Sequence, residues 1–168
     1  QALGNDKTAA GLDELAAGLR ISDEKLNEAI IASLKKRNAA TPLLDRALDV
    51  KAPVDARVNA LAGVRSLKPK DAAGRVAPLL TDIKATSEPV REAVAFALCV
   101  VDAAAAEGAL VQSLKTEPSP KVRYYLALAL GELKTAAAKS AVAAQLKVEK
   151  DLVVLDSLER AARKQSAK

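Results

Sequence analysis

The chain has 168 residues, half of them apolar but only three aromatic, so its core must be built from Ala, Leu and Val. Such small side chains let helices approach closely, and the Leu, Ala, Lys and Glu content favours helices over a sheet. The net charge of +5 is spread evenly over both halves, which disfavours a nucleic-acid patch, and no apolar run is long enough to span a membrane.

The N-terminal part predicts one lone helix followed by one helix pair. Residues 6–20 place Leu12, Leu15 and Leu19 on one side of a helix, as expected for an amphipathic segment. Residues 23–50 then predict two helices, and Ser22 followed by acidic residues is typical of a helix start. The chain begins at Gln1 without any methionine and shows no signal-peptide pattern, so it fits either a processed, exported protein or a piece of a longer one, and its compartment stays open.

Three further helix pairs follow, and they repeat one pattern. Arg57, Arg91 and Arg123 lie at equivalent positions, separated by 34 and 32 residues. After each arginine come an amphipathic helix, a short break and a second helix. The predicted repeats span residues 54–84, 88–116 and 120–147, and residues 151–165 form a last, single helix.

Local signals support these boundaries. Ser87 and Ser119 each precede a proline near a predicted helix start, where the hydroxyl can accept an N–H and proline has none to lose. Gly131, in "ALGEL", is explained by close packing between helices. A two-helix unit can bury its apolar stripe only against another unit, so consecutive pairs are expected to stack and share one core.

The Val-Arg start, the Ala and Leu positions and "ALGEL" at 129–133 resemble HEAT repeats, in particular the short bacterial repeats first noted in phycobilin lyases. The resemblance is strong over residues 88–147 and weaker before them. It implies an all-α fold, a right-handed α-solenoid of about four HEAT-like helix pairs with a single capping helix at each end. The whole chain, 1–168, would then be a single domain whose second helices line the concave side.

The residue types argue against catalysis. The chain has no histidine and one cysteine, Cys99, which lies among apolar residues and is expected in the core. Neither a usual catalytic triad nor a structural zinc site can be assembled, so no catalytic residue, metal or cofactor is predicted. We therefore expect a non-catalytic scaffold for protein–protein interaction. The resemblance leaves two alternatives open, a subunit of a bilin-lyase-like enzyme and a nucleic-acid-binding protein.

Candidate binding residues follow from the repeat register. The repeat arginines are expected to be structural, because the resembling family uses this position to bond neighbouring loops. The ends and outward positions of the second helices predict a surface for an acidic partner protein, made of Arg46, Thr81, Lys84, Gln112, Lys115 and Lys147. Tyr124 is a candidate interface anchor, since tyrosine is common where interfaces concentrate binding energy. Stacked units could also associate end to end or join a larger assembly.

Overall fold

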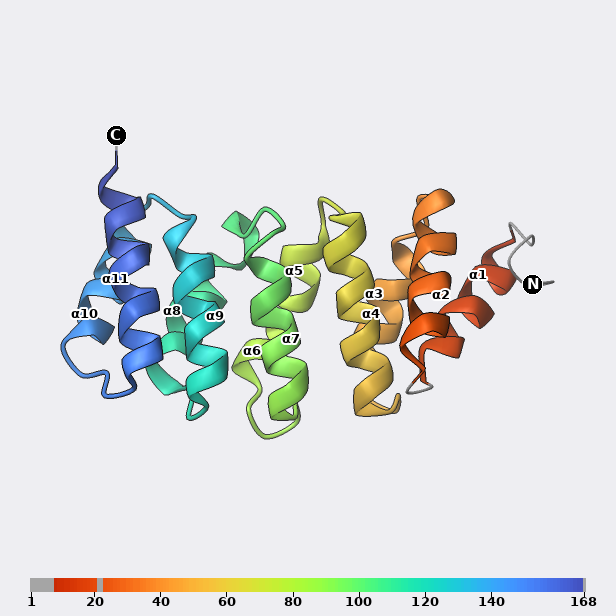
Figure 1. The fold of residues 1–168 in the computed structure, drawn as a ribbon, viewed down its shortest axis with the longest axis horizontal. Helices are drawn as coiled ribbons and strands as arrows, with labels where there is room; N and C mark the ends of the chain where they lie inside the picture. Colours follow the sequence, from red (N-terminus) through yellow and green to blue (C-terminus); the bar gives the residue numbers. More distant parts are fainter. Residues whose placement is uncertain (1–7, 21–22, 168) are drawn as a thin grey trace. The chain divides into compact units, whose positions relative to one another are not determined.

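The structure, a computed structural model, describes residues 8–20 and 23–167, and every regular element in these ranges is a helix (Figure 1). The helices group into two compact units, one up to Ala72 and the other from Ala73 onward. The predicted all-α class is confirmed. The start of the first predicted helix, at residues 6 and 7, and the predicted helix start at Ser22 lie outside the described residues.

Unit 1 is built from α1 (Ala9–Ala17), which continues as a short 3₁₀ turn, α2 (Glu24–Lys36), α3 (Thr41–Leu48) and α4 (Val54–Leu67). The carboxylate of Asp23 caps α2 by accepting a hydrogen bond from the N–H of Leu26. Helix α3 packs along α4, and α1 contacts both α2 and α3. The lone helix and the first pair that the sequence predicts are therefore present in this unit.

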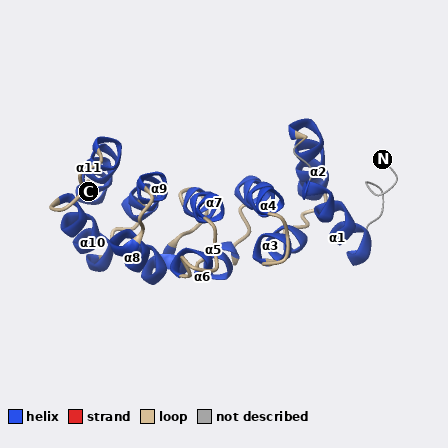
Figure 2. Cartoon of the chain, turned by 90° about the horizontal axis from the view of Figure 1, so that it is seen from below, coloured by secondary structure: helices blue, strands red, loops and turns tan. Residues whose placement is uncertain are grey.

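Unit 2 has two layers of helices (Figure 2). One layer contains α7 (Glu88–Leu98), which carries Arg91, α9 (Pro120–Gly131), which carries Arg123, and α11 (Leu152–Ser166). The other contains α5 (Ala72–Val76), α6 (Pro78–Thr81), α8 (Glu107–Thr116) and α10 (Ala136–Leu146). Helix α9 packs between α7 and α11, and α10 packs beside α8, so successive pairs stack on one another as predicted.

One predicted helix is broken in two. The sequence predicts a continuous second helix in repeat 54–84, whereas the chain forms α5 and α6 with a turn at Ala77 between them. Pro78 explains the break, because proline has no N–H to donate and its ring collides with the carbonyl one turn earlier. Helix α6 then ends at Thr81, so Lys84 lies in the following turn and not at a helix end.

The helix starts and the tight helix contact agree with the sequence. Ser87 and Ser119 are the N-cap residues of α7 and α9, and Ser119 Oγ accepts from the N–H of Val122, although Ser87 makes no such bond. A Cβ placed on Gly131 would lie 2.9 Å from the Cα of Ala161, so α9 and α11 touch at backbone distance. Among the described residues, no helix is both long and apolar enough to cross a membrane.

Candidate functional site

Two of the repeat arginines each bind a glutamate in the loop after the next second helix. Arg91 on α7 donates from Nε and Nη2 to the two carboxylate oxygens of Glu117, at 2.7 and 2.9 Å. Its Nη1 donates to the carbonyl of Thr86, in the loop before α7. The Glu117 side chain is completely buried and that of Arg91 is 5% exposed, so this two-pronged ion pair is shielded from water.

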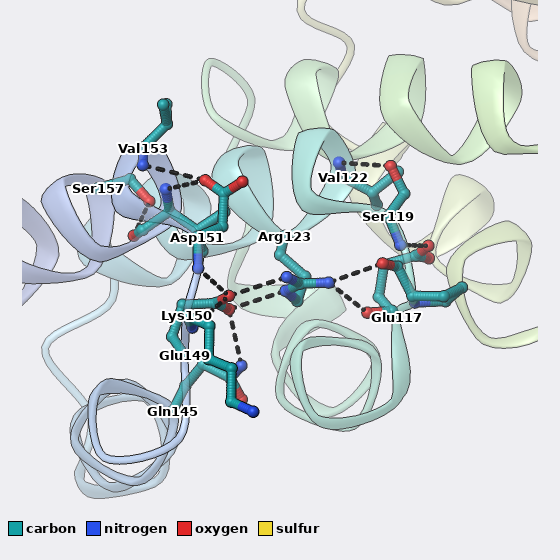
Figure 3. Close-up of polar contacts among 12 residues, drawn as sticks. Glu117, Ser119, Val122, Arg123, Gln145, Glu149, Lys150, Asp151, Val153 and Ser157 are labelled. Carbon is teal, nitrogen blue, oxygen red and sulfur yellow. Dashed lines mark hydrogen bonds and ion pairs between the residues drawn. The ribbon is translucent and has the colours of Figure 1, made fainter.

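Arg123 repeats the arrangement one helix pair further on (Figure 3). Its Nε and Nη2 donate to the carboxylate of Glu149, both at 2.8 Å, and its Nη1 donates to the carbonyl oxygens of Glu117 and Pro118. Glu149 also accepts from Gln145 and from two backbone N–H groups. The Arg123 guanidinium, with these further donors, lowers the pKa of Glu149 to about 2.

Arg57 occupies the same repeat position in unit 1 but has no carboxylate. It is 4% exposed, and its Nε donates to the carbonyl of Ala47 at 2.9 Å, while its Nη2 finds no partner. Burial lowers the pKa of Arg57, and the nearby Asp49 opposes that shift. Arg91 and Arg123 each bind the glutamate 26 residues further along the chain. The residue 26 positions after Arg57 is Ile83.

The repeat arginines therefore point inward and use their donors within the chain. Arg91 and Arg123 each tie a helix of one layer to loops on both sides of it. These contacts place no reactive group at the surface. The sequence contained the arginine positions but did not reveal the glutamates, because each partner lies 26 residues away in a loop.

The predicted partner surface on the second helices consists of separate polar side chains. Gln112 and Lys115 are exposed on α8, and Lys147 is exposed at the C-cap of α10. Thr81 is exposed at the end of α6, where its hydroxyl donates to the carbonyl of Pro78. Arg46 belongs to unit 1, where it is half-buried on α3 and pairs with Asp49 at 3.6 Å.

The three aromatic residues of the chain gather on the other layer of unit 2. Phe96 on α7 stacks with Tyr125 on α9, with ring centroids 4.7 Å apart, and Tyr124 meets Tyr125 edge-on at 5.1 Å. All three are half-buried, so none belongs to the closed core. Cys99, expected in the core, is also half-buried, and its Sγ lies 3.3 Å from the carbonyl oxygen of Tyr125.

A cleft of about 370 Å³ lies beside this aromatic cluster. It is lined by Glu92 of α7, by Pro120, Lys121, Tyr124 and Tyr125 of α9, and by Asp151, Val153 and Val154 at the start of α11. Next to it, the residues Leu152 and Val153 are 80% and 63% exposed. The sequence predicts a binding role for Tyr124 but not for Phe96 or Tyr125. The repeat register contains a signal for this cluster. When the repeats are aligned, Tyr124 is equivalent to Glu92, and the position of Tyr125 is one helical turn from that of Phe96.

The described residues, 8–20 and 23–167, contain no group of three or more His, Cys, Asp or Glu side chains that could hold a metal ion. The features that the site offers are thus an aromatic surface, a small cleft and two carboxylates. These features are suited to binding.

Comparison with known proteins decides the family. The profile of the family described as HEAT repeats matches residues 76–163, slightly more than half of the chain. The chain belongs to the HEAT-repeat family. HEAT repeats are typical of scaffolds for protein–protein interaction, and the matched part of this HEAT-repeat chain contains the aromatic cluster and both arginine–glutamate pairs.

Two further comparisons concern solved structures and curated proteins. Among solved structures, this HEAT-repeat chain is similar to human deoxyhypusine hydroxylase in complex with glycerol, with 15% identity and a TM-score of 0.42. The similarity covers 98% of this chain and 87% of that one. No curated protein matches the sequence.

Proposed function

We propose that this HEAT-repeat chain is a non-catalytic module that binds a partner protein on the face formed by α7, α9 and α11. The observation that carries the proposal is that all three aromatic residues lie together, half-exposed, beside a cleft on this face. Aromatic side chains offer a large contact area at a low cost in conformational entropy, and they are enriched at the centres of interfaces.

The packing of the cluster supports a rigid binding surface. Phe96 and Tyr125 are stacked across two helices, and α7 and α9 are held in place by the buried Arg91–Glu117 pair and the part-buried Arg123–Glu149 pair. A surface that is already ordered loses little entropy when a partner binds. The arginines would therefore contribute to binding only by holding the helices.

The second helices are the alternative surface. The sequence predicts that they line a concave groove for an acidic partner, and Gln112, Lys115 and Lys147 are exposed there. Lysine is depleted at the centres of interfaces, because its long, strongly hydrated side chain is costly to order and to desolvate. We therefore place the main contact on the aromatic face and treat the lysines of the second helices as a competing hypothesis.

The proposal is tested by photo-crosslinking in extracts of the native source. A photo-reactive phenylalanine analogue replaces Tyr124 in one variant, Gln112 on α8 in a second and Lys139 on α10 in a third, and crosslinked proteins are identified by mass spectrometry. We expect one discrete protein to crosslink from position 124. Lys139 is exposed and serves as the control, from which the same protein should not be captured.

A second measurement separates binding from folding. Tyr124→Ala should lower the captured amount of that protein by about tenfold, because Tyr at an interface centre commonly contributes more than 1 kcal/mol. Its melting temperature should change little, since Tyr124 lies outside the closed core. Capture from position 112 and not from 124 would favour the second helices. Absence of discrete crosslinks from both positions would overturn the proposed function.

A further inference from the structure

We infer that the cleft beside the aromatic cluster takes an arginine side chain from the partner protein, with an apolar neighbour of that arginine resting on Leu152 and Val153. The inference rests on the proposed function and adds the chemistry of the partner to it. At about 370 Å³, the cleft is near the small end of the range for ligand pockets, which suits one anchoring side chain.

The charges of the cleft favour a cation. Its wall contains two carboxylates, Glu92 and Asp151, against one ammonium group, that of Lys121, although the whole chain is positively charged. No hydrogen bond or ion pair joins the Glu92 carboxylate to another residue in 8–20 or 23–167. Asp151 uses Oδ1 to accept from the N–H groups of Val153 and Val154, which leaves its Oδ2 able to accept from a ligand.

The aromatic wall favours arginine over lysine. Tyr124 and Tyr125 both line the cleft, so a side chain that enters it lies against two aromatic residues. A guanidinium is planar, stacks on aromatic rings and is less strongly hydrated than an ammonium group. Its several N–H donors can also reach carboxylates on two sides, here one from α7 and one from the start of α11.

The rim of the cleft adds an apolar contact. Val153 lines the cleft and is 63% exposed, and the adjacent Leu152 is 80% exposed. Large apolar side chains that are this exposed, next to an aromatic cluster, are typical of an interaction surface. A partner segment in which arginine is flanked by leucine or a similar residue would cover both the cleft and its rim.

The test uses the whole chain and a blocked heptapeptide that carries one arginine between two leucines. Because the chain has two tyrosines and no tryptophan, and both tyrosines line the cleft, intrinsic tyrosine fluorescence reports on this site. Matched peptides carry lysine, glutamine or glutamate in place of the arginine. We expect the arginine peptide to bind most tightly, the lysine peptide more weakly, and the glutamate peptide not at all.

Variants of the chain identify the carboxylates. Glu92→Gln combined with Asp151→Asn should weaken binding of the arginine peptide by about tenfold or more, since charge-assisted hydrogen bonds are about twice as strong as neutral ones. Asparagine preserves the N-cap of α11. Glu92→Gln alone should have a smaller effect in the same direction, which keeps the test valid if the double variant is unstable. Glu159→Gln, an exposed change on α11, is the control and should leave binding unchanged.

The possible failures are distinct. Equal binding of the glutamate and arginine peptides would overturn the arginine inference. The absence of any fluorescence change with about 1 mM arginine peptide would also overturn it, because binding would then be very weak. The proposed function would still stand if position 124 crosslinks a partner protein. If position 124 captures no partner but the arginine peptide binds, the cleft would be a cation site without the proposed protein interface.

Discussion

At the scale of single residues, the repeat arginines differ in the partner group that a substitution would leave without a hydrogen bond or ion pair. Arg91 neutralises Glu117, whose side chain is completely buried, whereas Arg57 bonds a backbone carbonyl and leaves its own Nη2 without a partner. Removing one member of a buried ion pair strands the other charge, but removing a donor from a carbonyl costs only the loss of a hydrogen bond.

We therefore predict unequal effects of the same substitution. Arg91→Met should lower the free energy of unfolding by about 3 kcal/mol or more, because it leaves a buried carboxylate unpaired. Arg57→Met should cost about 1 kcal/mol, since methionine fills much of the space and only one bond to Ala47 is lost. Urea denaturation followed by circular dichroism measures both. Equal losses would show that the carboxylate does not determine the cost.

The Arg123–Glu149 pair predicts a pH dependence of stability. The folded pKa of Glu149 is about 2, below its ordinary value of 4.5, so folding favours the carboxylate. This contribution is fully present above about pH 4.5 and is lost as the pH falls toward 2. A shift of this size corresponds to about 3 kcal/mol.

Glu149→Gln should therefore be less stable than the unchanged chain at pH 7, and the difference should shrink as the pH falls from 4.5 to 2. Chemical denaturation at a series of pH values gives the difference curve. Glu159→Gln is the control, because Glu159 is 59% exposed and its ion pair with Arg163 contributes little. A difference that stays constant over this window would contradict the assignment to Glu149.

At the scale of helices, two glycines in unit 2 differ in the space available for a side chain. Gly131 ends α9 where the backbone of α11 approaches, and an added Cβ would lie 2.9 Å from the Cα of Ala161. Gly108 lies in the first turn of α8, and an added Cβ would meet nothing within 4 Å.

Gly131→Ala should lower the free energy of unfolding by about 1–3 kcal/mol, because the contact is with backbone and the two helices must move apart. Gly108→Ala should raise it by about 0.5 kcal/mol, because alanine loses less conformational entropy in a helix. Thermal unfolding of the two variants side by side measures both signs. A stabilised Gly131→Ala would mean that α9 and α11 are not packed this closely.

The helices also show what the sequence could and could not predict. The starts of α7 and α9 were predictable because serine and proline act locally at a helix start. The break at Pro78 is not predicted by the sequence pattern, because the apolar positions continue on both sides of the proline. The site depends on contacts between helices. Tyr124 could be chosen from its neighbours in sequence, but its edge-on contact with Tyr125 and the stack of Tyr125 on Phe96 could not be predicted in this way.

At the scale of the whole molecule, stability follows from contacts between successive helix pairs. In a stacked array each unit is stabilised mainly by its neighbours, so local stability depends on how many neighbours an element has. In unit 2, α9 packs against α7, α8, α10 and α11, whereas α6 packs against α7 and α8. The Arg123–Glu149 pair adds a part-buried link between α9 and the loop after α10.

Hydrogen exchange should show this gradient. Within unit 2, the amides of α9 should exchange more slowly than those of the short α6, because opening α9 breaks contacts with four helices at once. Glu149→Gln should speed exchange in α9, α10 and α11 together, since the lost link joins them, and should affect α6 least. Mass spectrometry of peptides from the exchanged chain resolves the four helices. If the substitution speeds exchange only in the loop at residues 147–151, the ion pair is a local contact and the stacked pairs do not share their stability.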